Sequence, residues 1–171
     1  MLRKLTLVSF ITPLLFIQAD AQNGPFVSSE GRFSIELSVL RTEDKNSAEA
    51  KIGGKTLWWR TERATFMVSY GDNPNAKREF AENAVMTSAD AYSSAIPKAA
   101  EIISRKKIEL DGYPGVEVMS REKDGYTAVA RYYAVETRVY CILALWSAGP
   151  NDKWVLKTLD SFKASVTPRA K

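Results

Sequence analysis

The residues from Tyr126 to Trp146 carry the strongest pattern of hydrophobic and polar positions in the chain. They predict two strands, Tyr126–Val135 and Arg138–Ser147, because Val, Tyr, Ile and Leu suit a pleated surface. In the second strand, both sets of alternate positions are apolar. Because successive side chains point to opposite faces of a sheet, we expect a central strand covered on both faces by helices.

The remaining pattern predicts further strands and two helices. The predicted strands are Arg32–Leu40, Lys55–Thr61, Arg63–Tyr70, Ile102–Leu110 and Tyr113–Lys123, and the predicted helices are Pro74–Ile96 and Pro150–Phe162. Alternating apolar positions indicate the strands, and apolar residues at helical spacing indicate the helices. Short turns such as Asp111-Gly112 favour antiparallel pairing. The predicted fold class is α+β, an antiparallel sheet of about six to seven strands sandwiched by helices.

The first 21 residues are typical of a secretory signal peptide. Arg3 and Lys4 begin it, Leu5–Ile17 is apolar, and Ala19–Ala21 forms an A-x-A cleavage site. The apolar stretch of about 13 residues is too short to span a membrane; an uncleaved anchor is the alternative. We therefore expect an exported protein, periplasmic or extracellular, with no integral membrane segment after cleavage. Its parts are the signal peptide at residues 1–21, one domain at residues 26–166 and a tail at residues 167–171.

The composition argues against a nucleic-acid partner and against an intramolecular disulfide bond. The formal net charge is +4, from 24 basic and 20 acidic residues. These charges are interleaved along the chain, so we expect no nucleic-acid partner. The only basic run, Arg105-Lys106-Lys107, is interpreted as a solvated strand face. A single cysteine, Cys141, forms no intramolecular disulfide, and its apolar neighbours predict a place in the core.

The absence of histidine removes most catalytic and metal sites. It excludes Ser-His-Asp and Cys-His nucleophilic sites and every histidine-ligated metal site. A carboxylate pair, a Ser-Lys dyad and hard-metal binding by oxygen ligands survive. The acidic residues at predicted turns lack the spacing of a calcium loop. We therefore assign no catalytic residue, no metal ligand and no cofactor.

Trp58 and Arg60 are the candidate binding residues. Adjacent strand residues point to opposite faces, so Trp59 lies on one face and Trp58 on the other, together with Arg60. If the second face is open, Trp58 is an exposed aromatic that can anchor a partner. If a helix covers it, Trp58 belongs to the core, and the high average burial of tryptophan favours this second interpretation.

Four short motifs follow one another along the chain. They are Phe26 with Gly31-Arg32-Phe33-Ser34, then Leu110–Gly115, then Arg131-Tyr132-Tyr133 with Arg138-Val139-Tyr140, and finally Leu159-Asp160-Ser161-Phe162. This pattern resembles small exported bacterial domains of the PsbP-like kind, related in fold to the extrinsic photosystem II subunit. The resemblance implies an antiparallel sheet between helical layers. It implies little about function, because most bacterial members have no assigned activity, and none of the photosystem subunit's binding residues is matched here.

The sequence therefore favours a non-enzymatic, exported accessory or binding domain of the bacterial cell envelope. Its partner is an envelope protein or a surface component that the sequence does not identify. Two alternatives stay open: a small carboxylate-dependent hydrolase, and a peripheral module of the membrane surface that uses aromatic residues beside cations.

Overall fold

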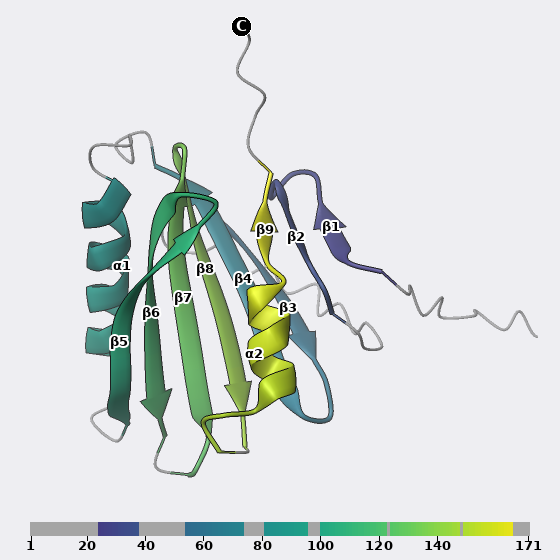
Figure 1. The fold of residues 1–171 in the computed structure, drawn as a ribbon, viewed down its shortest axis with the longest axis vertical. Coiled ribbons are helices and arrows are strands. Elements are labelled where there is room, and N and C mark those ends of the chain that lie inside the picture. The colour runs from purple at the N-terminus through teal and green to yellow at the C-terminus, as the bar shows by residue number, and fades with distance from the viewer. Residues whose placement is uncertain are drawn as a thin grey trace, which may run out of the picture.

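The computed structural model describes residues 24–37, 54–73, 81–95, 100–122, 124–147 and 149–165 (Figure 1). Its elements in chain order are β1 (Phe26–Ser28), β2 (Phe33–Ile35), β3 (Lys55–Arg60), β4 (Ala64–Asp72), α1 (Ala81–Ala95), β5 (Glu101–Leu110), β6 (Tyr113–Arg121), β7 (Thr127–Val135), β8 (Arg138–Trp146), α2 (Lys153–Asp160) and β9 (Lys163–Ala164). The predicted signal peptide and the predicted tail lie outside the described residues.

Six strands form one antiparallel sheet in the order β3-β4-β8-β7-β6-β5. Each predicted hairpin is present: β3 pairs with β4, β5 with β6, β6 with β7, and β7 with β8. The pairing of β4 with β8 joins the first hairpin to the strands that follow α1. The predicted hairpin is confirmed by the pairing of β7 with β8, and β8 is a central strand between β4 and β7. The predicted coverage of β8 by a helix on both faces holds only in part, because α1 packs mainly on β6 and β7 and the residues of β8 on that face are half-buried.

The turn between β5 and β6 needs backbone angles that few residues adopt. Asp111 and Gly112 both have positive φ, 51° and 78°. Positive φ at both central residues defines a type I′ turn, whose twist matches that of the flanking strands. Asp and Gly tolerate this conformation better than other residues, which explains why the dipeptide predicted the hairpin.

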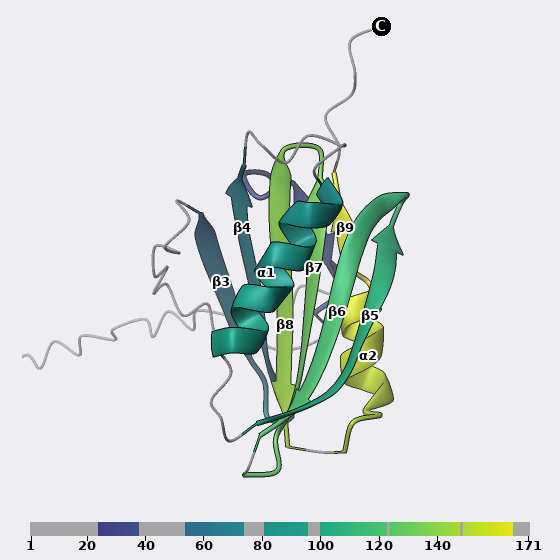
Figure 2. The ribbon, with the colours of Figure 1, turned by 90° about the vertical axis from the view of Figure 1, so that its left-hand side faces the viewer.

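One face of the main sheet is covered by α1, which packs on β6 and β7 (Figure 2). Ala81, Val85 and Ala89 of the helix are buried. They recur every four residues and therefore form one stripe along the helix. This stripe packs against Val118 and Tyr132 of the sheet to form the smaller of two core clusters. Small residues in the stripe let the helix approach the strands closely.

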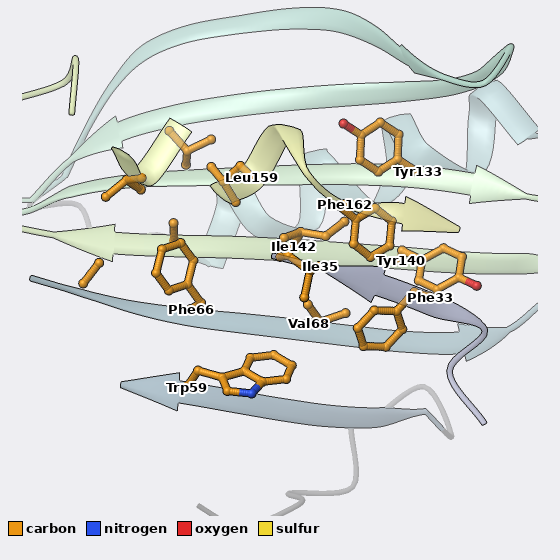
Figure 3. Packing of buried hydrophobic residues seen from close by; sticks show 14 of the residues in the cluster. Phe33, Ile35, Trp59, Phe66, Val68, Tyr133, Tyr140, Ile142, Leu159 and Phe162 are labelled. Atoms are coloured by element: carbon orange, nitrogen blue, oxygen red, sulfur yellow. The ribbon is translucent and has the colours of Figure 1, made fainter. Parts of the chain in front are cut away.

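The other face is covered by α2 and by a second, three-stranded sheet in the order β1-β2-β9. Phe33 from β2 stacks on Phe162, which follows α2, with 5.6 Å between ring centroids. Tyr140 of β8 meets Phe162 edge to face at 5.4 Å. Figure 3 shows these rings between the two layers, within the larger core cluster. The prediction of an α+β fold with helices on both faces is thus confirmed.

The second sheet corrects one sequence prediction. The strand predicted at Arg32–Leu40 is β2, which covers only Phe33–Ile35 and lies outside the main sheet. Residues 38–40 are not among the described residues. Both pairing partners of β2 are strands of three residues or fewer, β1 and β9. Such short strands carry no alternation long enough to detect.

The helix predictions are confirmed with shorter bounds. The N-terminal start predicted for α1 at Pro74 and its end near Ile96 lie outside the described residues. The helix α2 begins at Lys153 because the Asp152 carboxylate caps it, accepting from the backbone N–H groups of residues 154 and 155. No helix in the described part of the chain combines the length and the apolar character needed to cross a membrane.

Candidate functional site

The adjacent tryptophans of β3 lie on opposite faces of the main sheet, as the strand pattern predicts. Trp59 is buried in the larger core cluster, with 5.0 Å between its ring centroid and that of Phe26. Trp58 lies on the face that also carries α1, and it is half-buried. Its environment is therefore neither that of a core residue nor that of a fully exposed one.

Trp58 belongs to a surface that crosses three strands. It pairs directly with Met67 of β4, and in the next row Arg60 pairs with Thr65. Thr65 pairs in turn with Leu145 of β8. Among the described residues, neither core cluster includes Trp58, Met67 or Leu145, and all three are half-buried. We call Trp58, Arg60, Thr65, Met67 and Leu145 the Trp58 surface.

In the described part of the chain, the Trp58 surface lies away from the strands on which α1 packs. The helix packs on β6 and β7, and β3 forms the opposite edge of the sheet (Figure 1). Arg60 is exposed and makes no ion pair within 4.0 Å with any described residue. A half-exposed indole thus lies on the same face as a guanidinium two residues along the strand, the combination that the sequence singled out. Both candidate residues lie on the same face of β3.

A buried ionic network crosses the opposite side of the sheet. The side chain of Glu117 on β6 is 3% exposed and accepts a hydrogen bond from Arg131 Nε on β7 at 2.7 Å. Lys106 Nζ on β5 lies 3.0 Å from the second oxygen of Glu117. Arg131 Nη1 also lies 2.7 Å from Asp160 at the end of α2. Each buried charge therefore has an opposite partner, and the network fastens α2 to the sheet.

Sequence reasoning missed this network, although a signal was present. It searched for acids at turns, whereas Glu117 lies between two valines and Arg131 between Ala130 and Tyr132. A charge inside an apolar strand is costly to bury unless an opposite charge satisfies it. A basic and an acidic residue inside the apolar patterns of two neighbouring predicted strands are therefore the sequence sign of a buried ion pair. We interpret its role as structural.

A second polar cluster fastens the small sheet to the main sheet. Arg138 donates from Nε and Nη2 to the two oxygens of Asp72, at 2.8 and 2.6 Å, and from Nη1 to the Glu30 carbonyl at 2.6 Å. The Tyr140 hydroxyl donates to the Gly31 carbonyl at 2.9 Å. The hydrogen bonds from Arg138 hold the pKa of Asp72 below its ordinary value. The motif residues Gly31, Arg138 and Tyr140 therefore have a structural role, which is to hold the small sheet against the main sheet.

A groove of about 530 Å³ lies between α1 and the β5–β6 hairpin. Its lining includes two carboxylates, Glu82 and Glu109, and a carboxylate pair is what the hydrolase alternative requires. Glu82 forms an ion pair with Lys107, and both carboxylates are exposed. A glycosidase acid needs a carboxyl held away from water, so these two residues give the hydrolase no support. No group of three or more metal-ligating residues is present in the described ranges.

Cys141 lies on the α1 face of β8, where it packs against the smaller core cluster. The residue is only partly buried, but its thiol is removed from water. This burial raises the pKa of the Cys141 thiol to about 11. A thiol that stays protonated at neutral pH is a poor nucleophile, so the predicted packing role fits better than a reactive one.

No protein family and no curated protein sequence matches this chain, but solved structures do. Cyanobacterial PsbP (CyanoP) from Synechocystis sp. PCC 6803 is 13% identical, with a TM-score of 0.56 over 82% of this chain and 91% of that one. A protein from Bacteroides thetaiotaomicron VPI-5482 is 12% identical, with a TM-score of 0.53 over 86% of this chain, which spans 50% of that protein's length. A protein of unknown function from Pseudomonas aeruginosa, PA94, reaches 0.48 at 13% identity and covers 86% and 98% of the two chains.

The likeness to CyanoP confirms the fold that the sequence motifs predicted. The structural similarity extends over most of both chains and includes the six-stranded antiparallel sheet of this one. At this level of identity the likeness concerns the fold alone. Function must therefore be argued from the surfaces of this chain.

Proposed function

We propose that this chain is a non-enzymatic accessory domain, exported to the bacterial cell envelope, that binds a partner protein through the Trp58 surface. The observation that carries the proposal is a half-exposed tryptophan on the same face as an arginine that has no ion-pair partner among the described residues. Tryptophan and arginine are the residues that most often dominate the energy of protein interfaces. Export rests on the predicted signal peptide at residues 1–21.

The position of Trp58 favours a protein partner over a lipid bilayer. Trp58 lies in the middle of a strand, with Met67 directly beside it. Binding at a membrane surface requires apolar side chains that reach roughly 5–10 Å into the lipid boundary. A half-buried ring in a sheet has no such reach. A flat, partly apolar surface with one cation suits a protein contact, in which both sides approach closely.

The first test asks whether Trp58 is accessible in the mature chain. Iodide quenching of tryptophan fluorescence is compared between wild type and Trp58→Phe. Trp59 and Trp146 are buried, whereas Trp154 is half-buried like Trp58. We therefore expect a quenchable, red-shifted component in wild type that falls in the variant to the share contributed by Trp154. N-terminal sequencing of the exported protein tests the cleavage separately, because a sequence starting at Met1 contradicts it.

The decisive test is site-specific photo-crosslinking in cells that export the protein. A photoreactive amino acid replaces Thr65, which pairs with Arg60 in the Trp58 surface, in one variant and Lys157, an exposed residue of α2, in a matched control. We expect a discrete adduct from position 65 and none from position 157. The purified partner should bind Trp58→Ala at least roughly thirtyfold more weakly than wild type, the size of an interface hot spot.

Three results would overturn the proposal. The first is equal crosslinking from both positions, which indicates chance encounters. The second is co-sedimentation of the mature chain with anionic vesicles at low salt that Trp58→Ala abolishes, which supports the membrane-surface alternative. The third is turnover of a glycan, ester or peptide substrate that is lost with one Asp, Glu or Ser substitution, which supports the hydrolase alternative.

A further inference from the structure

The basic run Arg105-Lys106-Lys107 lies in the middle of β5. All three residues are exposed, as predicted, but each also has an acidic partner. Arg105 Nη1 lies 2.6 Å from Asp90 of α1, Lys106 lies 3.0 Å from Glu117, and Lys107 pairs with the glutamate in the first turn of α1. These ion pairs hold the side chains over the two faces of the sheet. The backbone edge of β5 is left uncovered by them.

The strand β5 is an open edge of the main sheet. It is ten residues long, comes last in the strand order, and pairs with β6 alone among the described strands. Figure 2 shows it at one side of the sheet, with β3 at the other. A bulge between Ile102 and Ser104 leaves residues 104–110 as the regular part. An unpaired edge of this kind presents backbone N–H and C=O groups that a further strand can bind.

The turn determines which of these groups face outward. A two-residue type I′ turn is closed by a hydrogen-bonded pair, here Leu110 with Tyr113. In an antiparallel ladder, hydrogen-bonded and non-bonded pairs alternate. The even-numbered residues of β5 therefore bond to β6. Arg105, Lys107 and Glu109 direct their N–H and C=O groups away from the sheet.

We propose that the edge of β5 binds an extended, acidic segment of a partner protein, which adds to the sheet as a further strand. A second copy of the chain fits this edge poorly. In the antiparallel register centred on Lys106, Arg105 lies opposite Lys107 of the other copy and the two Lys106 residues face each other, and like charges directly opposite destabilise a strand pair. Acidic residues at those positions meet the exposed cations instead. This edge is distant from the Trp58 surface in the strand order, so the inference goes beyond the proposed function and does not depend on it.

The groove beside β5 supplies a place for a side chain of the added strand. Met86 of α1 and Val116 of β6 contribute apolar lining, and Lys107 and Glu109 contribute from β5 itself. Neighbouring strands lie about 4.8 Å apart, so a long apolar side chain on the α1 face of the added strand reaches this groove. The edge thus offers backbone bonding for affinity and a groove for selectivity.

The test uses a capped peptide of alternating valine and glutamate as the probe, and the mature chain labelled for NMR. Amide hydrogen exchange is measured at each residue of β5 with and without the peptide. We expect new protection at Arg105, Lys107 and Glu109 and no new protection at Lys106 and Ile108, whose amides already bond to β6. A peptide of alternating valine and lysine is the charge control and should bind much more weakly.

A backbone variant isolates the hydrogen bond. Lys107→Pro removes one outward donor, and proline is tolerated at an edge where its nitrogen faces solvent. Lys107→Ala is the matched control, because both variants lose the ion pair with α1. We expect the proline variant to bind the glutamate peptide at least roughly fivefold more weakly than the alanine variant. Circular dichroism shows whether each variant is folded.

Four outcomes overturn the inference. The glutamate peptide binds but does not protect the amides of Arg105, Lys107 and Glu109 selectively, or it does not bind at the highest soluble concentration. The lysine peptide binds as tightly as the glutamate peptide, or the folded Lys107→Pro and Lys107→Ala variants bind the glutamate peptide with equal affinity. Protection of the same amides in the free chain, together with a dimeric mass, assigns the edge to a second copy instead and overturns the choice of partner.

Discussion

Removing Arg131 from the buried network should destabilise the fold strongly. In Arg131→Met, the carboxylate of Glu117 loses its partner at 2.7 Å while its side chain stays 3% exposed. Among the described residues, Lys106, whose side chain is 60% exposed, is the ion-pair partner that remains beside it. Breaking a buried ion pair from one side typically costs about 3–5 kcal/mol, because a charge is left uncompensated. Since Lys106 retains one contact, we expect a loss of about 3 kcal/mol, the lower end of that range.

The double variant separates the cost of an unpaired charge from the loss of attraction. In Arg131→Met with Glu117→Leu, both buried charges are gone, and replacing a buried pair by apolar residues is often neutral. We therefore expect the double variant to recover most of the loss. Asp160→Ala is the control: that side chain is 65% exposed, so its removal should cost under about 1 kcal/mol.

Urea denaturation of the mature chain, followed by tryptophan fluorescence, measures each free energy of unfolding. The slope against urea concentration should stay constant across the set, so that midpoints report stability. The reasoning is refuted if Arg131→Met costs less than about 1 kcal/mol. It is equally refuted if the double variant is no more stable than the single one.

Three further predictions concern single sites. Gly115→Ala places a Cβ 2.5 Å from the Tyr133 ring and should cost about 1–3 kcal/mol in urea denaturation, whereas Gly149→Ala, with nothing within 4 Å, should not. Asp72→Asn should destabilise the protein at neutral pH, because a carboxyl whose pKa is lowered in the folded state contributes stability only while it is ionised. The difference in urea midpoint between wild type and the variant should therefore disappear as the pH falls below 3.8. A difference that does not depend on pH contradicts this. Maleimide should label native Cys141 slowly at neutral pH, because burial raises the pKa of its thiol to about 11 and keeps it protonated, and complete native labelling within minutes contradicts the assignment.

The main sheet could be predicted because its strands pair largely with sequence neighbours. Each hairpin from β5 to β8 is closed by a short connection, so alternation and turn residues within a small window suffice. The small sheet follows a different logic. Its strand β2 pairs Phe33 with Ala164, at the far end of the described chain. Only the folded main sheet brings these two segments together, and no local pattern encodes that contact.

The candidate site divides in the same way. The period of two in β3 was enough to separate Trp58 from Trp59, and the structure confirms that separation. The period cannot tell whether a face is covered, because coverage depends on where α1 crosses the sheet. The prediction of a core position for Trp58 used the average burial of tryptophan in proteins, which carries no information about where α1 lies. In the structure Trp58 is half-buried, so a core position is not confirmed.

The width of the sheet explains why α1 does not reach the Trp58 surface in the described part of the chain. Six strands spaced about 4.8 Å apart span roughly 25 Å, whereas a helix with its side chains is about 10–12 Å wide. One helix therefore covers two or three strands, and α1 is placed over β6 and β7. The opposite face has two covering elements among those described, α2 and the small sheet, and its core reaches as far as Trp59 on β3. Among the described elements, one helix therefore spans too little of the wide sheet to reach Trp58, and the same reasoning predicts that lengthening β3 alone would not bring Trp58 under α1.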